Sequence, residues 1–211
     1  MIIQNFVNNS LNLSNPIKIG ITGGIGSGKS VVSKILETYE IPVYNADKEA
    51  RRIIDTNATV REGLINAFGS DVYVKGTLNR SLLSKIVFNN PEKLKVLNSI
   101  THPVVISEGE KWFNNQKKAI VAKEAAIFFE SGSAGSLDIM IGVYAPEAVR
   151  INRVVNRDKI TVQEVKSRMK NQINEEIKMR LCDYVVVNDD KQLVTVQVEN
   201  ILKTIIERNE N

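Results

Sequence analysis

One stretch near the start of the chain has residue types and a spacing that suit phosphate binding. Residues 23–30 read Gly-Gly-Ile-Gly-Ser-Gly-Lys-Ser and fit the pattern G-x-x-x-x-G-K-[ST], in which glycines let backbone N–H groups turn inward around phosphate oxygens. Lys29 brings a mobile positive charge to the outer phosphates, and the Ser30 hydroxyl can coordinate Mg²⁺. This motif, the P-loop, predicts that the chain binds a nucleoside triphosphate.

The flanking residues give the motif the context that it needs. Residues 17–22 form a short β-branched run typical of a buried strand, and residues 31–37 have a helical pattern whose first turn would face the anion. A glycine-rich turn that binds nothing does not account for this strand-loop-helix order. A second strand at 41–45 and a helix at 48–55 follow, so the chain opens with a strand-helix-strand unit and predicts a parallel sheet.

Three later segments extend this sheet, and a long insert interrupts it. Further strands are expected at 119–124, 139–144 and 184–188. Between Asp47 and Lys118 lies far more chain than the dozen or so residues that a parallel crossover needs. The insert has helical patterns at 60–68, 82–88, 92–100 and 104–114, with a turn at Lys75-Gly76. A helical excursion of this length indicates a substrate-binding lobe.

A second group of residues suited to phosphate chemistry follows the strand at 139–144. Arg150, Arg153 and Arg157 fall within a stripe about 60° wide on a predicted helix, opposite Ala148, Ile151 and Val155. A charge run is usually a solvated face. Phosphoryl transfer, however, needs cations around the moving group, and the planar guanidinium clamps phosphate oxygens at two points. We therefore interpret the stripe as part of a lid over the phosphates.

Four single residues could take part in chemistry. Asp47 follows the second strand, where a carboxylate at the sheet edge could act as base or orienter for an attacking hydroxyl, or simply cap a helix. Glu124 ends a strand and could hold Mg²⁺ through water. Alternatively, it could be a charged residue at the edge of the sheet that binds no ligand. His102, the only histidine, stands before a proline at an expected helix start, and a structural role is the first interpretation. Cys182 suits packing.

Composition excludes several classes of protein. The 211 residues are 43% hydrophobic and 25% charged, which is ordinary for one soluble globular domain. The net charge of +4 and the 6% aromatic content argue against a nucleic-acid-binding ATPase, and no run is long enough to span a membrane. A single cysteine and the lack of a signal-like start predict a cytoplasmic protein. A GTP-operated switch would need an Asn-Lys-x-Asp segment, which the chain lacks.

Taken in order, the motifs of this chain resemble those of one family, dephospho-CoA kinase, the last enzyme of coenzyme A synthesis. The stretches that carry the resemblance are residues 21–30, Asn45-Ala46-Asp47 with Ala50 and Arg51, residues 76–80 leading to Val87-Phe88, His102-Pro103, Phe129-Glu130, Arg153 with Arg157-Asp158, Arg168 with Gln172, and Asp183 followed by Asn188. The likeness covers nearly everything from Ile17 to Lys203. The P-loop alone does not separate this family from other small kinases, but the ordered set does.

The resemblance implies transfer of the ATP γ-phosphoryl group to the ribose 3′-hydroxyl of dephospho-CoA. It implies the α/β fold of nucleoside monophosphate kinases, with a five-stranded parallel core, a helical CoA lobe and a helical lid. Asp47, Lys29, Arg153 and Arg157 would be catalytic, Asp47, Arg80 and His102 would bind the acceptor, and Ser30 and Glu124 would hold Mg²⁺. The ATP-binding residues would be Gly24, Ile25, Gly26, Ser27, Gly28, Lys29, Ser30, Val31 and Asn188. A kinase for a different small acceptor stays the alternative.

We expect residues 1–15 to be a loosely ordered extension and residues 16–211 to form a single kinase domain. Its core would comprise 16–58, 118–145 and 181–211, the CoA lobe about 59–117, and the lid about 146–180. The partners would be ATP and dephospho-CoA, with no nucleic acid or membrane, in a monomer or a small homo-oligomer.

Three short stretches depart from the family pattern. Glu124-Ala125-Ala126 replaces Asp-x-Pro, so the longer acid would hold the metal differently or through an extra water. Val31 replaces threonine, and Asp190 replaces a glycine.

Overall fold

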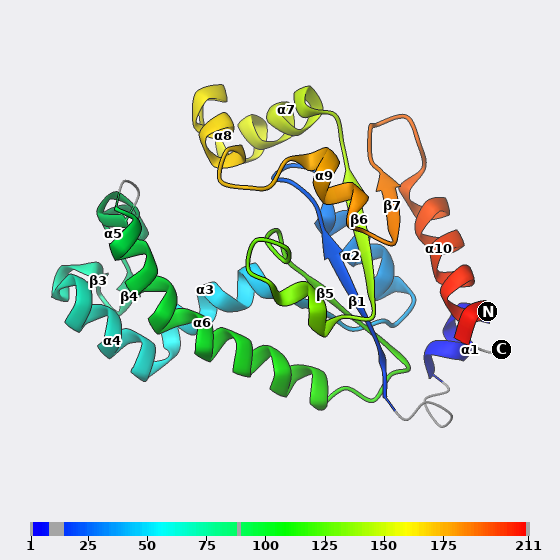
Figure 1. Ribbon diagram of the computed structural model, residues 1–211, viewed down its shortest axis with the longest axis horizontal. Coiled ribbons are helices and arrows are strands. Elements are labelled where there is room, and N and C mark those ends of the chain that lie inside the picture. The colour runs from blue at the N-terminus through cyan, green and yellow to red at the C-terminus, as the bar shows by residue number, and fades with distance from the viewer. Residues whose placement is uncertain (1, 9–14, 88–89, 210–211) are drawn as a thin grey trace. The chain divides into compact units, whose positions relative to one another are not determined.

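The structure, a computed structural model, describes residues 2–8, 15–87 and 90–209 (Figure 1). The chain forms two compact units. The first combines the residues up to Asn45 with those from Gln116 onward, and the second comprises Ala46–Asn115. The second unit therefore begins earlier than the lobe that the sequence predicted, because the helix after the second strand belongs to it rather than to the core.

The first unit is built on a parallel sheet. Its five strands have the order β2-β5-β1-β6-β7, and every neighbouring pair is parallel. The strands are β1 (Ile17–Thr22), β2 (Val43–Asn45), β5 (Ile120–Glu124), β6 (Ile139–Tyr144) and β7 (Tyr184–Val187). The predicted five-stranded parallel core is confirmed. The central strand β1 is followed directly by the P-loop, so the loop lies at the carboxyl edge of the sheet, where ligands bind in open α/β sheets.

The strands consist of nearly continuous apolar residues, which suits a sheet whose faces are covered by helices. Ile19, Ile21, Ile120 and Ile141 are fully buried in one cluster. Helices α2 (Lys29–Thr38) and α10 (Val194–Asn209) contribute Val32, Leu36, Val198, Ile201, Leu202, Ile205 and Ile206 to the same cluster. A parallel sheet needs such cover on its faces, which explains the β-branched composition that made these strands predictable.

Helix α1 (Ile2–Asn8) corrects one expectation. Ile3 and Val7 are buried in the core cluster, and the Val7 carbonyl accepts a hydrogen bond from the Ala119 N–H (3.1 Å). The prediction of a loose extension is therefore wrong for residues 2–8, because the i, i+4 spacing of these side chains gives the segment an apolar face to bury. Residues 9–14 lie outside the described residues.

The second unit is mainly helical, as predicted, and carries one small hairpin. Strands β3 (Tyr73–Val74) and β4 (Thr77–Leu78) pair antiparallel around the expected turn, where Lys75 and Gly76 both have positive φ, as a two-residue hairpin turn requires. The helices are α3 (Ala46–Thr56), α4 (Ala58–Phe68), α5 (Arg80–Val87) and α6 (Pro91–Asn114), with a 3₁₀ turn at Ser70–Val72. Their own apolar cluster, centred on Ile53, Val60 and Leu64, holds the unit together.

Helix α6 differs from the prediction of two helices. It runs without a break from Pro91, behind an Asn90 cap, to Asn114, with Pro103 in its interior. Proline removes one backbone hydrogen bond and usually ends or kinks a helix. Here Ile100, Val104 and Val105 on both sides of it pack against the same cluster, and this packing stabilises the continuous helix.

Three helices lie between β6 and β7 in the chain, where the lid was expected (Figure 1). They are α7 (Glu147–Asp158), α8 (Val162–Met169) and α9 (Glu175–Arg180). Thr161 and Glu164 form a capping box at the start of α8. A short 3₁₀ helix at Ser133–Ser136 precedes β6. No helix in the described part of the chain combines the length and the apolar character needed to cross a membrane.

Candidate active site

The P-loop connects β1 to α2 and depends on glycine at the point where the helix begins. Gly28 has φ 98° and lies in the left-handed region, directly before the first helical residue Lys29. A Cβ at this position would be 2.0 Å from Nδ2 of Asn188, so a side chain is excluded by contact as well as by backbone conformation. Helix α2 therefore begins directly after the loop, and the N-terminus of a helix is a position that suits an anion.

A cavity of about 160 Å³ lies against this loop and collects most of the predicted phosphate and metal residues. It is lined by Gly26, Gly28, Lys29, Ser30, Glu124, Arg153, Val154 and Arg157. These residues come from the P-loop, the end of β5 and helix α7. The Lys29 ammonium donates hydrogen bonds to the carbonyl oxygens of Gly23 (2.9 Å) and Gly24 (3.4 Å). The fold therefore brings together cations, a hydroxyl and a carboxylate that are far apart in the sequence.

Glu124 is buried at the end of β5 and is held firmly. One of its carboxylate oxygens accepts hydrogen bonds from Ser33 Oγ (2.8 Å) and from Asn45 Nδ2 (3.0 Å). It lines the same cavity as Ser30. Among the described residues, no three His, Cys, Asp or Glu side chains gather closely enough to hold a metal ion. A carboxylate and a hydroxyl still suit Mg²⁺, which in phosphate-transfer sites takes only one or two protein oxygens.

The arginine stripe of α7 faces the P-loop, but the helix is oriented differently from the prediction. Arg150 is buried together with Val154, whereas Ala148, expected on the packed side, is exposed. The reason is a close contact: a Cβ at Gly26 would be 2.5 Å from the Arg150 carbonyl oxygen, so the backbone of α7 packs directly on the loop. Arg157 lines the cavity and is paired with Asp158 (2.7 Å).

Arg153 joins three parts of the site. Its guanidinium donates to the P-loop carbonyls of Gly26 and Ser27 (3.4 Å each), and to the Asn188 carbonyl (3.1 Å) and side-chain oxygen (3.2 Å). It also forms an ion pair with Asp190 (2.6 Å). This guanidinium therefore links α7 both to the loop and to the segment after β7.

Asn188 and Asp190 follow β7 and brace the same loop. The buried Asn188 donates from Nδ2 to the Ser27 carbonyl (2.8 Å). Asp190 has φ 65°, the left-handed conformation that glycine adopts most easily. The residue that replaces the family's glycine therefore keeps a glycine-like backbone, and its carboxylate meets Arg153.

If Arg153 stabilises a transferred phosphoryl group, as the sequence predicts, Arg153→Met should lower kcat/KM by about 10²-fold, a typical cost of losing one preorganised donor to developing charge. Methionine keeps much of the side-chain volume, so packing changes little. Steady-state kinetics with varied ATP measures the effect. The matched control is Arg180→Met on α9, an exposed arginine whose loss should leave kcat/KM within about twofold. Equal activity of the two variants would contradict a role for Arg153.

The residues predicted to bind the acceptor all lie in the second unit. Asp47 is exposed in the first turn of α3, and His102 is exposed on α6. Arg80, the first residue of α5, pairs with Asp55 (2.6 Å) and donates to the Arg51 carbonyl (3.5 Å). Their roles stay predictions.

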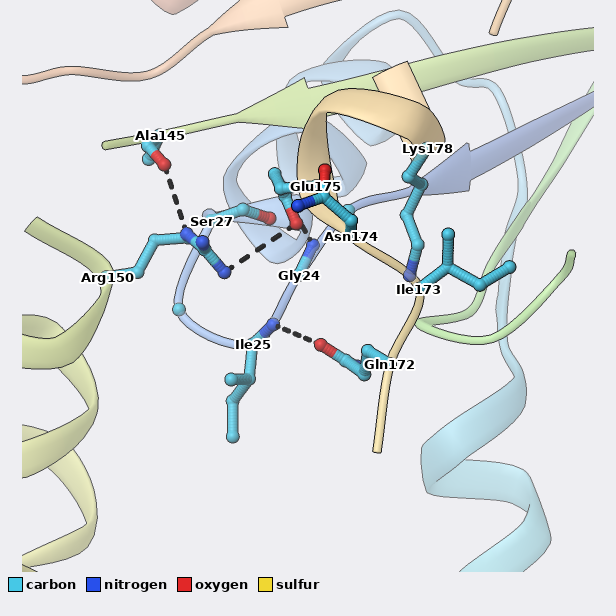
Figure 2. Close-up of polar contacts among 12 residues, drawn as sticks. Gly24, Ile25, Ser27, Ala145, Arg150, Gln172, Ile173, Asn174, Glu175 and Lys178 are labelled. Carbon is cyan, nitrogen blue, oxygen red and sulfur yellow. Dashed lines mark hydrogen bonds and ion pairs between the residues drawn. The ribbon is translucent and has the colours of Figure 1, made fainter. Parts of the chain in front are cut away.

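The first turn of the P-loop has protein acceptors that the sequence analysis missed (Figure 2). The Gly24 N–H donates to Glu175 Oε1 (3.1 Å), and the Ile25 N–H donates to Gln172 Oε1 (3.1 Å). Gln172 was noted only as part of a motif, and Glu175 was not singled out. No local pattern identifies Glu175, because its partner lies 151 residues away in the chain.

A buried ion pair holds α9 beside this site. The fully buried Lys178 ammonium donates to the Ala126 carbonyl (2.9 Å) and to Glu130 Oε1 (2.9 Å). Glu130 Oε1 also accepts the Ile173 N–H (3.0 Å). Burial raises the pKa of Glu130, but the hydrogen bonds from Lys178 and Ile173 outweigh it and hold this pKa below its usual 4.5.

We predict that Glu130→Ala destabilises the protein at pH 7 by about 3 kcal/mol, because it leaves Lys178 buried without a counter-charge. The pKa of Glu130 is lower folded than unfolded, so its contribution is present above the unfolded value and is lost as pH falls through the folded one. Urea unfolding should therefore show a smaller difference between variant and parent at acidic pH. Glu199→Ala, which removes an exposed pair with Lys203, should cost under about 1 kcal/mol.

The sheet order, the P-loop at its carboxyl edge and the cation-lined cavity define a P-loop phosphotransferase. A family model described as dephospho-CoA kinase matches residues 17–194, and the chain belongs to the dephospho-CoA kinase family. A dephospho-CoA kinase of Porphyromonas gingivalis is 38% identical over 196 residues, covering 92% of this chain and 97% of that protein. The corresponding Bacteroides fragilis protein is 35% identical over 193 residues, covering 91% and 94%.

Solved structures agree with this assignment. A crystal structure from Thermus thermophilus matches with a TM-score of 0.81 and 33% identity over 92% of this chain and 98% of that one. A dephospho-CoA kinase from Campylobacter jejuni matches with a TM-score of 0.66 and 29% identity over 91% and 98%. A shikimate kinase from Acinetobacter baumannii, at 17% identity and a TM-score of 0.53 over 94% and 98%, shares the fold.

Proposed function

We propose that the protein is an ATP-dependent kinase that transfers the γ-phosphoryl group of ATP to the ribose 3′-hydroxyl of dephospho-CoA, giving coenzyme A and ADP. The observation that carries the proposal is the cavity where Lys29 and Ser30 of the P-loop meet Glu124, Arg153 and Arg157, in a chain of this family. Phosphoryl transfer needs positioning and charge stabilisation rather than covalent chemistry from the protein, and these residues supply both.

The P-loop binds the phosphates of ATP in this proposal. Backbone N–H groups of the loop from Gly26 to Val31 and the N-terminus of α2 surround the phosphate oxygens. The N–H groups of Gly24 and Ile25, which the resemblance also assigned to ATP, instead donate to Glu175 and Gln172. Lys29 leaves the loop carbonyls and contacts the outer phosphates. Asn188 supports the nucleotide through the Ser27 carbonyl that it holds.

Mg²⁺ with ATP is the proposed cofactor. The Ser30 hydroxyl would bind the ion directly, and Glu124 would bind it directly or through a water. When bound, the ion neutralises phosphate charge. The hydrogen bonds from Ser33 and Asn45 to one Glu124 oxygen orient the carboxylate for this task.

The acceptor is bound by Asp47, Arg80 and His102. Asp47 acts as the general base or orienter for the attacking hydroxyl, and Arg80 and His102 bind the dephospho-CoA molecule. The segment 146–180, with α7, α8 and α9, acts as a lid whose Arg153 and Arg157 stabilise the moving phosphoryl group and exclude water. The lobe is the second unit, and we expect the enzyme in the cytoplasm.

An acceptor panel tests the function. The purified protein is mixed with ATP and Mg²⁺ and with dephospho-CoA or nucleoside monophosphates in turn, and ADP release is followed together with mass-spectrometric detection of the product. A control without Mg²⁺ tests the metal. Turnover that depends on dephospho-CoA and yields coenzyme A supports the proposal. Equal turnover of nucleoside monophosphates would show a kinase for a different acceptor.

A further inference from the structure

Two backbone N–H groups in the first turn of the P-loop donate hydrogen bonds to protein side chains. The N–H groups of Gly24 and Ile25 donate to Glu175 and Gln172, whereas the cavity beside the loop is lined by the later residues Gly26, Gly28, Lys29 and Ser30. Buried N–H groups need acceptors. The loop is therefore divided into a cavity-facing part and a first turn whose N–H groups bind two side chains, Gln172 in the connection before α9 and Glu175 at the first residue of α9.

Glu175 has a second partner that fixes it in place. Its Oε2 lies 3.6 Å from Arg150 Nη1, and the two side chains are only 10% and 8% exposed. Arg150 also donates from Nε to the Ala145 carbonyl (3.0 Å), as Figure 2 shows. A Cβ at Gly24 would be 2.4 Å from each of these two side chains, so the turn packs closely against the carboxylate and the guanidinium. The opposite charges of these two mostly buried side chains offset each other.

Arg150 extends this contact to the arginines of α7. It lies on the same helix as Arg153 and Arg157, which line the phosphate cavity. The Gly26 backbone packs against the Arg150 carbonyl at the same place. Because the Glu175 carboxylate holds Arg150, it also determines how α7 packs on the P-loop. The packing of α7 in turn determines where Arg153 and Arg157 point.

We propose that Glu175 is a positioning residue for ATP: through Gly24 N–H and Arg150 it fixes the first turn of the P-loop and the α7 arginines in one arrangement. Gln172 supports the same turn through Ile25. The inference rests on the proposed function only in requiring that the P-loop binds ATP, and not on the identity of the acceptor.

Removing Glu175 should not unfold the protein. Arg150 also borders a cavity of about 390 Å³, into which an unpaired guanidinium can turn toward water. The substitution should then change the positions of the P-loop and of α7, because both lose their contact with the Glu175 carboxylate. We expect Glu175→Ala to raise the Kd for Mg·ATP at least about tenfold, the usual scale for losing a charged hydrogen bond. The KM for dephospho-CoA should stay within about twofold.

Isothermal titration of Mg·ATP into four variants tests this, each at a temperature well below its own Tm. The variants are Glu175→Ala, Arg150→Met, the double variant Arg150→Met/Glu175→Gln, and the charge-matched control Glu199→Ala on α10. The double variant keeps an oxygen for the Gly24 N–H and leaves no unpaired charge, so its ATP affinity should recover to within about threefold of the parent. Gln172→Ala, expected to weaken binding about fivefold, provides a second test if Glu175→Ala does not fold.

Two outcomes would overturn the inference. If Glu175→Ala binds ATP as the control does, Glu175 has no positioning role. If it binds ATP more tightly than the parent, Glu175 competes with phosphate for the loop and does not organise it. A parent protein that binds ATP but does not phosphorylate dephospho-CoA would refute the proposed function and leave this test intact.

Discussion

Lys29→Ala should lower kcat/KM by about 10³-fold and leave the fold intact. The ammonium of Lys29 rests on the Gly23 and Gly24 carbonyls at the edge of the cavity that also holds Ser30 and Glu124. In the proposed reaction it moves to the outer phosphates, where it offsets charge in the ground state and more strongly in the transition state. A 10³-fold loss corresponds to about 4 kcal/mol, a plausible share for one cation in a largely electrostatic reaction.

The measurement is steady-state kinetics with both substrates varied, together with thermal unfolding. Lys34→Ala is the matched control, because Lys34 is an exposed lysine on the same helix α2. It should keep kcat/KM within about twofold. Lys29→Arg is informative as well, because it keeps the charge but replaces a compact ammonium with a planar guanidinium. We expect its activity to lie between those of Lys29→Ala and the parent. Normal efficiency of Lys29→Ala would refute the assignment of this residue.

Asp47→Asn should lower kcat by about 10³-fold, within the range observed for loss of a general base. Asparagine has nearly the same shape, and the lost interaction of the charge with the helix dipole is worth about 0.3–1 kcal/mol, so the stability of α3 should change little. The Kd for Mg·ATP should also be unchanged, because the proposed partner of Asp47 is the acceptor hydroxyl. The loss would therefore lie in turnover and not in nucleotide binding.

Glu49→Gln provides the comparison for Asp47. Both acids lie in the first turn of α3, so both interact with the helix dipole, but Glu49 pairs with Arg52 (2.6 Å). If the two variants lose activity equally, the effect comes from the helix terminus and not from a base. A kcat within about threefold of the parent for Asp47→Asn would remove Asp47 from the mechanism.

Several local features of this protein could be predicted from its sequence, because they depend on interactions between residues that are close together in the chain. The strands of a covered parallel sheet need apolar β-branched runs, and β1 and β6 begin and end where those runs do. The turn at Lys75-Gly76 depends on short-range backbone conformation and was found. The P-loop was found for the same reason.

Predictions failed where packing over a distance outweighed a local rule. Pro103 should end a helix, yet apolar neighbours on both sides of it keep α6 continuous. The polar first segment contained enough apolar residues at helical spacing for Ile3 and Val7 to join the core. On α7 the buried side is set by the close approach of Gly26 and not by the apolar stripe.

The sequence by itself determined that a triphosphate loop lies at the edge of a parallel sheet, because the spacing of glycines, lysine and serine and the flanking apolar runs are contained in one continuous segment. Only the tertiary structure decided what holds that loop. Glu175 and Gln172 reach its first turn from about 150 residues away, and Arg153 and Asn188 brace its later part. Such contacts follow from how helices α7 and α9 dock beside the sheet, and no periodicity within a segment encodes which carboxylate will meet which backbone N–H.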